Sequence, residues 1–294
     1  MRFEKWQALG NDYLILERDE IPFELTPGRI RRLCQGHFGV FADGVLVLAP
    51  PADPAHVADL RIFNPDGSEA ELSGNGAREA ILYLRRRGWT DEDSFAIHTA
   101  AGTIRPTITG PDTCTVEMGS ASLRSADFPG GPEDGRGEVL AGGKRWAFRH
   151  VSIGNPQCAI HVGSAEELAA LDLAAIGPSI EGDRQFPNRT NVSWYTELEP
   201  GALSATRRIR ARIFERGVGE TLSSGTGASG AAVALVVEDA GGEPAGARVT
   251  VMLDGGELEV EVGEDLQVNL TGWARPVFEG RLSDDFAKEL DETE

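Results

Sequence analysis

The feature that most constrains this chain of 294 residues is an internal duplication. The tripeptide Arg61-Ile62-Phe63 recurs as Arg212-Ile213-Phe214, and a serine follows each phenylalanine at the same spacing, at Ser73 and Ser224. Both serines begin the pattern Ser-Gly-x-Gly-Ala. Upstream, a Gly-Asn pair at residues 10–11 recurs at residues 154–155. Matched landmarks in the same order predict two similarly folded domains.

The segments around these landmarks predict a mixture of strands and helices. An apolar face at helical spacing predicts a helix from Ala77 to Arg87, which ends before Gly88. The Ala/Val-rich stretch 228–239 predicts a second helix that is buried on all sides. The remaining predicted segments are strands at 45–48, 59–63 and 257–262, the last one half exposed, and a Gly-, Pro- and charge-rich loop at 125–143.

The fold class predicted from this arrangement is α+β. We expect two pseudo-symmetric domains with a cleft between them, each a curved, mainly antiparallel sheet or barrel around a central helix. The N-terminal domain is expected to span residues 1–120 and to be completed by 274–294, and the C-terminal domain to span 121–273.

Composition limits the partners of the chain. The 28 Lys and Arg residues against 47 Asp and Glu residues give a net charge of −19, which repels phosphates and anionic lipid. We therefore expect no nucleic-acid or membrane partner, and no apolar run is long enough to span a bilayer. The three cysteines, Cys34, Cys114 and Cys158, are odd in number and irregularly spaced. They predict buried free thiols in a cytoplasmic protein, without a disulfide framework or a zinc or other metal site.

The paired glycine turns are candidate binding sites. A Ser-Gly-x-Gly-Ala turn that opens a helix presents free N–H groups and the positive end of the helix dipole, which together favour an anion. Two such turns, one in each domain, could converge on one small carboxylate in the cleft. The ordinary alternative is that Ser73 and Ser224 are only helix N-caps, but their symmetric pairing favours a site.

A nucleotide site is a weaker interpretation of the same residues. Residues 225–230 match the pattern G-x-G-x-x-G of dinucleotide-binding proteins. The residues before them do not form a convincing buried strand, and the first copy breaks the pattern at Glu79. The sequence also contains no P-loop.

Five sequence blocks in a fixed order cover nearly the whole chain and match those of a known family. The blocks are Leu9-Gly10-Asn11-Asp12-Tyr13, Phe63-Asn64-Pro65-Asp66-Gly67-Ser68 with Gly74-Asn75-Gly76-Ala77-Arg78, Gly154-Asn155-Pro156, Arg189-Thr190-Asn191-Val192, and Glu215-Arg216-Gly217-Val218-Gly219-Glu220-Thr221 with Gly225-Thr226-Gly227. In these blocks the sequence resembles the diaminopimelate epimerases, which are cofactor-independent amino-acid epimerases built from two similar domains around a cleft.

The resemblance implies roles for particular residues. The carboxylate at the reacting carbon would be bound by Gly74, Asn75, Gly225 and Thr226. The far end of the substrate, a second amino-acid group, would be held by Asn11, Asn64, Asn155, Asn191, Glu215 and Arg216. This is chemically sensible, because a guanidinium can fork onto a carboxylate, a carboxylate can accept from an ammonium, and amides can do either. The asparagines could instead be turn residues, although four at the positions of the family fit a zwitterionic ligand better.

The sequence departs from the family at its catalytic pair. Where the family has two cysteines that exchange a proton with opposite faces of the α-carbon, this chain has Ser73 and Ser224. Lesser changes of the family pattern stand at Gly44, Glu79, Gln157 and Ser229. A serine hydroxyl has a pKa several units above that of a thiol, so serine needs an adjacent base. None of the five histidines lies in a site motif.

Three interpretations remain open. In the first, Ser73 and Ser224 are the acid/base pair of an epimerase that interconverts LL- and meso-diaminopimelate. In the second, the chain is a related isomerase, racemase or dehydratase that acts on another amino-acid-like substrate. In the third, it is a non-catalytic diamino-acid binder, or the serines were engineered to trap a substrate.

The first interpretation carries further expectations from the resemblance. It implies an isomerase that works without pyridoxal phosphate in lysine and other amino-acid biosynthesis, in the cytoplasm. Its partner would be a small zwitterionic amino acid, and the family resemblance also implies a homodimer.

Overall fold

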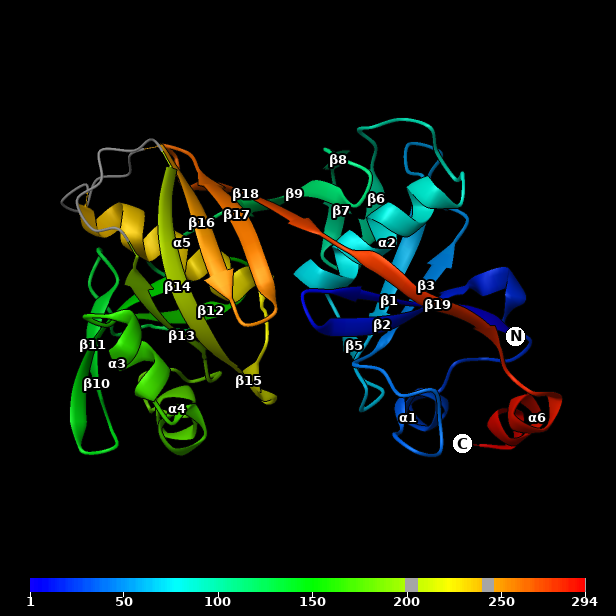
Figure 1. The fold of residues 1–294 in the computed structure, drawn as a ribbon, viewed down its shortest axis with the longest axis horizontal. Coiled ribbons are helices and arrows are strands. Elements are labelled where there is room, and N and C mark those ends of the chain that lie inside the picture. The colour runs from blue at the N-terminus through cyan, green and yellow to red at the C-terminus, as the bar shows by residue number, and fades with distance from the viewer. Residues whose placement is uncertain (199–205, 240–245, 294) are drawn as a thin grey trace. The chain divides into compact units, whose positions relative to one another are not determined.

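The computed structural model describes residues 1–198, 206–239 and 246–293 (Figure 1). Within it the chain forms two compact units. The first unit comprises Met1–Val116 and Gly272–Glu294, and the second unit comprises Glu117–Thr271. The first unit is therefore assembled from both ends of the chain.

The elements of the first unit are mostly short. Its strands are β1 (Arg2–Ala8), β2 (Asn11–Glu17), β3 (Val45–Ala49), β4 (Ala58–Phe63), β5 (Glu69–Ala70), β6 (Ile97–Thr99), β7 (Gly102–Ile104), β8 (Pro106–Ile108) and β19 (Arg275–Arg281). Its helices are the 3₁₀ turn η1 (Arg18–Glu20), α1 (Pro27–Cys34), α2 (Gly74–Arg86) and α6 (Asp284–Glu292).

The second unit has longer strands. They are β10 (Arg136–Ala141), β11 (Lys144–Ser152), β12 (Pro156–His161), β13 (Asn191–Glu197), β14 (Thr206–Glu215), β15 (Gly219–Thr221), β16 (Ala247–Leu253) and β17 (Gly256–Val262). Its helices are α3 (Ala165–Ala170), α4 (Leu173–Glu181) and α5 (Gly225–Asp239). The chain passes from one unit to the other within β9 (Thr113–Ser120) and again within β18 (Gln267–Trp273).

The fold is α+β, with two large sheets and few helices. In the described residues one sheet has the order β19-β1-β2-β3-β4-β6-β7, with β5 beside β4. The other has the order β10-β11-β12-β13-β14-β16-β17-β18-β9-β8, with β15 beside β14. Neither order returns to its first strand, so of the two predicted forms, sheet or barrel, the structure has the open sheet.

The strand pairings of the first unit recur in the second, which confirms the duplication. β1 to β4 pair in succession as antiparallel, parallel and antiparallel neighbours, and so do β11 to β14. The short β5 and β15 each pair antiparallel with the strand before them. After the long helix, β6 joins β4 in parallel, just as β16 joins β14. One more pairing repeats, because β7 pairs antiparallel with β6 just as β17 pairs antiparallel with β16.

A duplicated ion pair shows that the two copies agree in register. Arg61 pairs with Glu69 in the first unit, and Arg212 pairs with Glu220 in the second. In both copies the glutamate lies opposite the phenylalanine of the repeated tripeptide, on the short strand that follows it. Residues of the two units can therefore be matched one by one.

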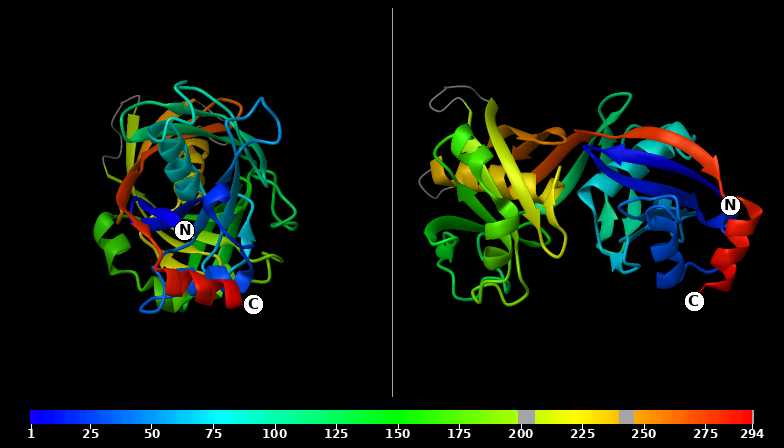
Figure 2. Two further views of the ribbon diagram at one scale, coloured as in Figure 1. Left: turned by 90° about the vertical axis from the view of Figure 1, so that its right-hand side faces the viewer. Right: turned by 60° about the horizontal axis from the view of Figure 1, so that its bottom comes forward.

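A long helix lies against the concave face of each sheet (Figures 1 and 2). Helix α2 packs on β1, β2 and β3, while α5 contacts strands from β11 to β17. Helix α5 is buried all along residues 227–237, as its Ala/Val-rich sequence predicts. Both helices begin three residues earlier than predicted, because the glycine turns themselves form the first helical turn.

One predicted loop contains a strand. Within residues 125–143, which the sequence predicts as a loop, β10 pairs with β11 along its whole length. Its side chains alternate, with Val139 and Ala141 buried and their neighbours exposed. The glycines and charged residues in and around β10 made this alternation hard to recognise in the sequence.

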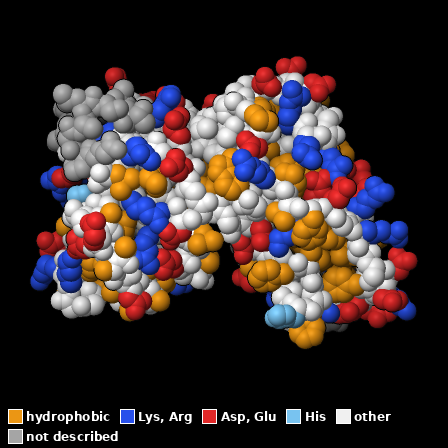
Figure 3. All heavy atoms as spheres, viewed as in Figure 1, with side chains coloured by type: hydrophobic (Ala, Val, Ile, Leu, Met, Phe, Trp, Pro, Cys, Tyr) orange, Lys and Arg blue, Asp and Glu red, His pale blue; other side chains and the backbone are white. Residues whose placement is uncertain are grey.

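The charged residues are spread over the surface of each unit. On the face drawn in Figure 3, acidic and basic side chains are interspersed over both units. No helix in the described part of the chain is long and apolar enough to cross a membrane.

Candidate active site

The two serines of the repeat occupy the same place in each unit, at the start of the long helix. Ser73 Oγ accepts a hydrogen bond from the Gly76 N–H at 3.1 Å, and Ser224 Oγ accepts one from the Gly227 N–H at 3.2 Å. Each serine therefore caps its helix. Gly227 is required by packing, since a Cβ there would lie 2.7 Å from Ile213 Cδ1.

In the first unit, the hydroxyl of Tyr13 reaches Ser73. This buried tyrosine on β2 donates a hydrogen bond to Ser73 Oγ at 3.2 Å. Together with the bond from Gly76, Ser73 Oγ accepts two hydrogen bonds, which fill both of its lone pairs. The hydrogen of Ser73 itself has no acceptor among the described residues and is available to a ligand.

Asn75 and Asn11, two of the predicted substrate-binding residues, contact each other. Asn75 Nδ2 donates to Asn11 Oδ1 at 3.2 Å, and Asn11 Nδ2 donates to Asp43 at 2.8 Å. On the other side, the guanidinium of Arg78 donates to Asn75 Oδ1 at 2.7 Å. These bonds hold the two amides in one orientation beside the helix start.

Arg78 and Glu79 are completely buried next to this network. Arg78 also donates to the carbonyl oxygen of Gly74 at 2.9 Å, so it fastens the first turn of α2. Neither carboxyl oxygen of Glu79 has a hydrogen-bond partner in the described residues. Burial raises the pKa of Glu79 well above its usual value, and the nearby Arg78 opposes this only in part. Glu79 therefore holds its proton more tightly than an exposed carboxyl group does.

Asn64, another predicted binding residue, lies in a turn after β4. Its side-chain amide donates to Ser68 Oγ at 2.9 Å, and its N–H bonds the Ser68 carbonyl. In the first unit the structure thus brings Asn11 and Asn75 into contact and leaves Asn64 in a separate local turn.

In the second unit, Ser224 has a carboxylate partner. The hydroxyl of this buried serine donates to Glu215 Oε2 at 2.9 Å. The other oxygen of Glu215 accepts from Thr221 Oγ1 at 2.8 Å. Ser224 Oγ receives only the bond from Gly227, so one of its lone pairs has no donor among the described residues.

The other predicted residues of the second unit form two pairs. Asn155 Nδ2 donates to Thr226 Oγ1 at 3.3 Å, and its oxygen accepts from Gln157 at 2.5 Å. Asn191 Oδ1 accepts from the Arg216 N–H at 2.9 Å. Asn191 Nδ2 donates to the Pro156 carbonyl, so both ends of this amide contact backbone.

The three cysteines do not compensate for the missing thiol pair. Cys34, Cys114 and Cys158 are buried and free, as predicted. Burial raises the pKa of Cys34 and of Cys114 to about 12, and raises that of Cys158 well above its usual value. Thiols this weakly acidic carry almost no thiolate at neutral pH.

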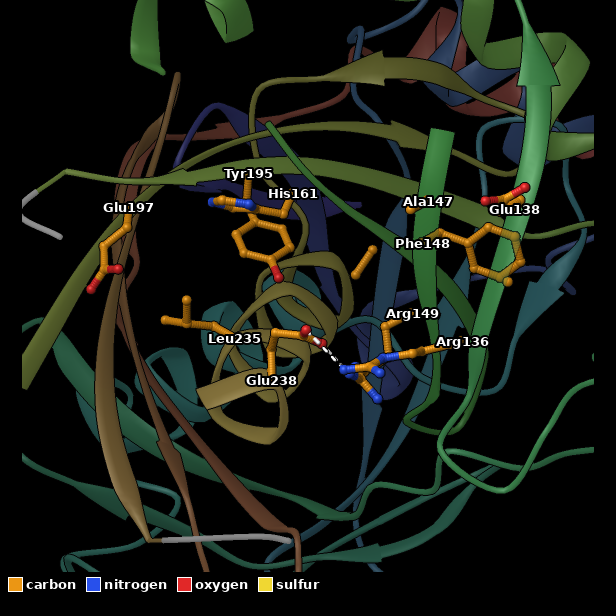
Figure 4. A pocket seen from close by; sticks show the side chains of 12 residues that line it. Arg136, Glu138, Ala147, Phe148, Arg149, His161, Tyr195, Glu197, Leu235 and Glu238 are labelled. Atoms are coloured by element: carbon orange, nitrogen blue, oxygen red, sulfur yellow. Dashed lines mark hydrogen bonds and ion pairs between the residues drawn. The ribbon is translucent and has the colours of Figure 1, made fainter. Parts of the chain in front are cut away.

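A cavity of about 560 Å³ lies elsewhere in the second unit (Figure 4). Leu235 and Glu238, from the last turns of α5, line it, far along the helix from Ser224. Arg149 points into the cavity and pairs with Glu238, which lowers the pKa of that carboxyl. The charges of Arg136, Arg149 and Glu238 in this cavity are paired with each other, whereas Ser73 and Ser224 keep hydrogen-bonding capacity for a ligand.

Sequence reasoning missed the partners of the two serines. It gave Glu215 a role at the far end of the substrate, but this carboxylate contacts Ser224. Tyr13 belongs to the first of the five family blocks, but the resemblance gave it no role. The available signal was Gly44, whose lack of a side chain leaves space for this phenol.

Solved structures of similar fold include a hydroxyproline epimerase, a probable proline racemase and several phenazine-biosynthesis proteins. A hydroxyproline epimerase from Agrobacterium vitis matches with a TM-score of 0.65 and 16% identity, covering 97% of this chain and 93% of that one. A phenazine-biosynthesis protein of the PhzF family from Bacillus anthracis matches with a TM-score of 0.65 and 17% identity, over 96% and 99%. The fold is therefore that of the two-unit racemases and epimerases.

Sequence comparison identifies the family within this class. The family model described as diaminopimelate epimerase matches residues 3–124 and 149–276. A diaminopimelate epimerase of Synechococcus sp. (strain JA-3-3Ab) is 40% identical, over 97% of this chain and 99% of the relative. A diaminopimelate epimerase of Pelotomaculum thermopropionicum is 38% identical, over 95% of this chain and 98% of the relative. The chain belongs to the diaminopimelate epimerase family, and it is an amino-acid epimerase, an isomerase.

Proposed function

We propose that the protein interconverts LL- and meso-diaminopimelate by proton transfer on both sides of the α-carbon. The observation that carries the proposal is the equivalent position of Ser73 and Ser224, each at a helix start with hydrogen-bonding capacity left for a ligand. Curated relatives that match almost the full chain bear the name of this activity.

The carboxylate next to Ser224 supplies what a serine base needs. As Ser224 Oγ takes the α-proton from carbon, its own hydroxyl proton moves to Glu215 Oε2, 2.9 Å away. The C–H bond breaks and a Glu215 O–H bond forms, so the negative charge passes from the carboxylate to the substrate. Serine thereby acts without becoming a free alkoxide, in the manner of other hydroxyls activated by an adjacent base.

The carbanion formed needs stabilisation at its carboxylate. The N–H groups of Gly74 and Asn75 in one unit, and of Gly225 and Thr226 in the other, open helices whose dipoles favour that anion. Asn11, Asn64, Asn155, Asn191 and Arg216 would hold the distal amino-acid group.

We further propose that the enzyme works without a cofactor, in the cytoplasm, as a homodimer. In the absence of pyridoxal phosphate, the carbanion charge rests on the substrate carboxylate and its hydrogen-bond donors alone. The cytoplasmic location follows from the place of diaminopimelate in lysine synthesis. Light scattering of the purified protein tests the dimer.

Isotope exchange tests the activity directly. The wild-type protein is incubated in D₂O with LL- or meso-diaminopimelate, while loss of the α-proton is followed by NMR and isomer composition by chiral chromatography. We expect exchange together with inversion, and loss of inversion in Ser73→Ala and in Ser224→Ala. Tight binding without exchange would instead support a binder, and a new keto or alkene product would support a dehydratase or another isomerase.

A further inference from the structure

The hydrogen-bond partners of Ser73 and Ser224 come from different positions of the duplicated frame. Phe63 and Phe214 are equivalent, so the residues after them, Asn64 and Glu215, occupy the same position. Glu215 accepts the hydrogen of Ser224, whereas Asn64 bonds to Ser68. The carboxylate partner is therefore present in the second unit alone.

The partner of Ser73 comes from a different position of the frame. Leu14 pairs with Val45 as Cys158 pairs with Val192, so the preceding residues, Tyr13 and Gln157, are equivalent. Tyr13 donates to Ser73, whereas the amide of Gln157 donates to Asn155. The phenol partner is thus specific to the first unit.

Space for the phenol depends on Gly44, which is next to Tyr13 across the parallel strands β2 and β3. A Cβ on Gly44 would lie 2.5 Å from Tyr13 Cε1. At the equivalent position of the second unit, Asn191 carries a full side chain opposite Gln157. The first unit therefore combines an aromatic hydroxyl with the glycine that admits its ring.

The hydrogen bonds give the serines opposite polarity. Ser73 accepts from Tyr13 and Gly76, so its remaining capacity is to donate its own hydrogen. Ser224 donates to Glu215 and accepts from Gly227, so its remaining capacity is to accept. A phenol, which ordinarily ionises near pH 10, is also a far better proton source than a serine hydroxyl.

We propose that Tyr13 is a positioning residue that passes its phenolic proton to Ser73, so that Ser73 donates a new proton to the carbanion after Ser224 has removed the original one. The inference rests on the proposed function. In the step, the Ser73 O–H bond breaks as a C–H bond forms at the carbanion, and the Tyr13 O–H bond breaks as the Ser73 O–H bond re-forms. The negative charge moves from carbon to the phenolate, and solvent later returns a proton to Tyr13 and removes one from Glu215.

Tyr13→Phe tests the inference, because it removes the hydroxyl and keeps the ring against Gly44. Each diaminopimelate isomer is incubated in D₂O, and α-proton exchange and inversion are measured separately. From the isomer whose α-hydrogen faces Ser224, exchange should stay within about threefold of wild type while inversion falls about 10²-fold. From the other isomer, exchange and inversion should both fall about 10²-fold.

Tyr83→Phe is the matched control, since Tyr83 also donates a buried hydrogen bond, to Glu17, at the other end of α2. It should leave both rates unchanged from either isomer. Equal loss of exchange and inversion from both isomers of Tyr13→Phe, or no loss, would overturn the role of Tyr13. Absence of any exchange in the wild-type protein would overturn the proposed function, and this inference with it.

Discussion

The first and second units share one backbone plan but carry different chemistry at its centre. Both place a serine at the N-cap of the long helix, with the same strand pairings around it. Beneath that serine the first unit has a phenol, and the second has a carboxylate. The comparison teaches that a duplicated frame fixes where a serine stands, while single neighbouring side chains decide whether its remaining hydrogen-bonding capacity is to donate or to accept.

Removing the carboxylate should have the largest effect on this comparison. In Glu215→Gln, Ser224 loses the group that accepts its hydroxyl proton, so we expect kcat for epimerisation to fall by about 10³-fold. Steady-state assays in both directions measure the change. Glu220→Gln, a neighbouring glutamate whose partner is Arg212, serves as the control and should retain activity. An activity of Glu215→Gln within threefold of wild type would contradict the assignment.

The two units should also respond to pH in opposite directions. Burial holds the pKa of Glu79 well above 4.5, so the folded first unit keeps a proton that the unfolded chain loses. The free energy of unfolding should therefore fall as pH rises above 4.5, by about 1.4 kcal/mol per unit, until the pH reaches the folded pKa. In the second unit, burial lowers the pKa of His150 from 6.5 to about 4. Stability should fall at a similar slope as pH drops from 6.5 to about 4.

Urea unfolding between pH 4 and pH 8 separates these contributions. In Glu79→Gln, the free energy of unfolding should fall less steeply as the pH rises. In His150→Gln, it should fall less steeply as the pH drops below 6.5. If Glu79→Gln left the alkaline slope intact, the carboxyl would be ionised in the folded protein. Each variant acts as the control for the other, because they lie in different units.

The smallest expected difference concerns the duplicated ion pair. The Arg61 side chain is 59% exposed, whereas that of Arg212 is 16% exposed and also donates to the carbonyls of Leu168 and Leu171. Arg61→Ala should therefore cost less than about 0.5 kcal/mol of unfolding free energy. Arg212→Ala should cost about 1 to 2 kcal/mol, because it removes a charged donor from the part-buried carbonyls of Leu168 and Leu171. Equal losses in urea titrations would show that the two copies are energetically alike.

The sequence predicts the frame well because the frame repeats. The spacing from Phe63 to Ser73 and from Phe214 to Ser224 is enough to predict two α+β units with equivalent helix starts. The strand β10 escaped prediction, since glycines and charges around Arg136–Ala141 mask its alternation.

The contacts of the serines could not be predicted from the same spacing. Tyr13 and Ser73 are 60 residues apart, and only the pairing of β2 with β3 and the packing of α2 bring the phenol to the hydroxyl. Glu215 and Ser224 are nine residues apart, but their contact depends on the turn through β15. Side-chain partners of this kind depend on tertiary packing rather than on local pattern.

The pairing of β1 with β19 sets the order in which the molecule can be completed. On the ribosome, β1 emerges long before Arg275–Arg281, which pair along it, and before α6, whose Leu290 enters the core of the first unit. The second unit is one continuous stretch of chain and can fold as soon as it has been synthesised. The unit translated first is therefore the last to reach its native form, and a nascent chain lacking its final residues keeps an open sheet edge along β1.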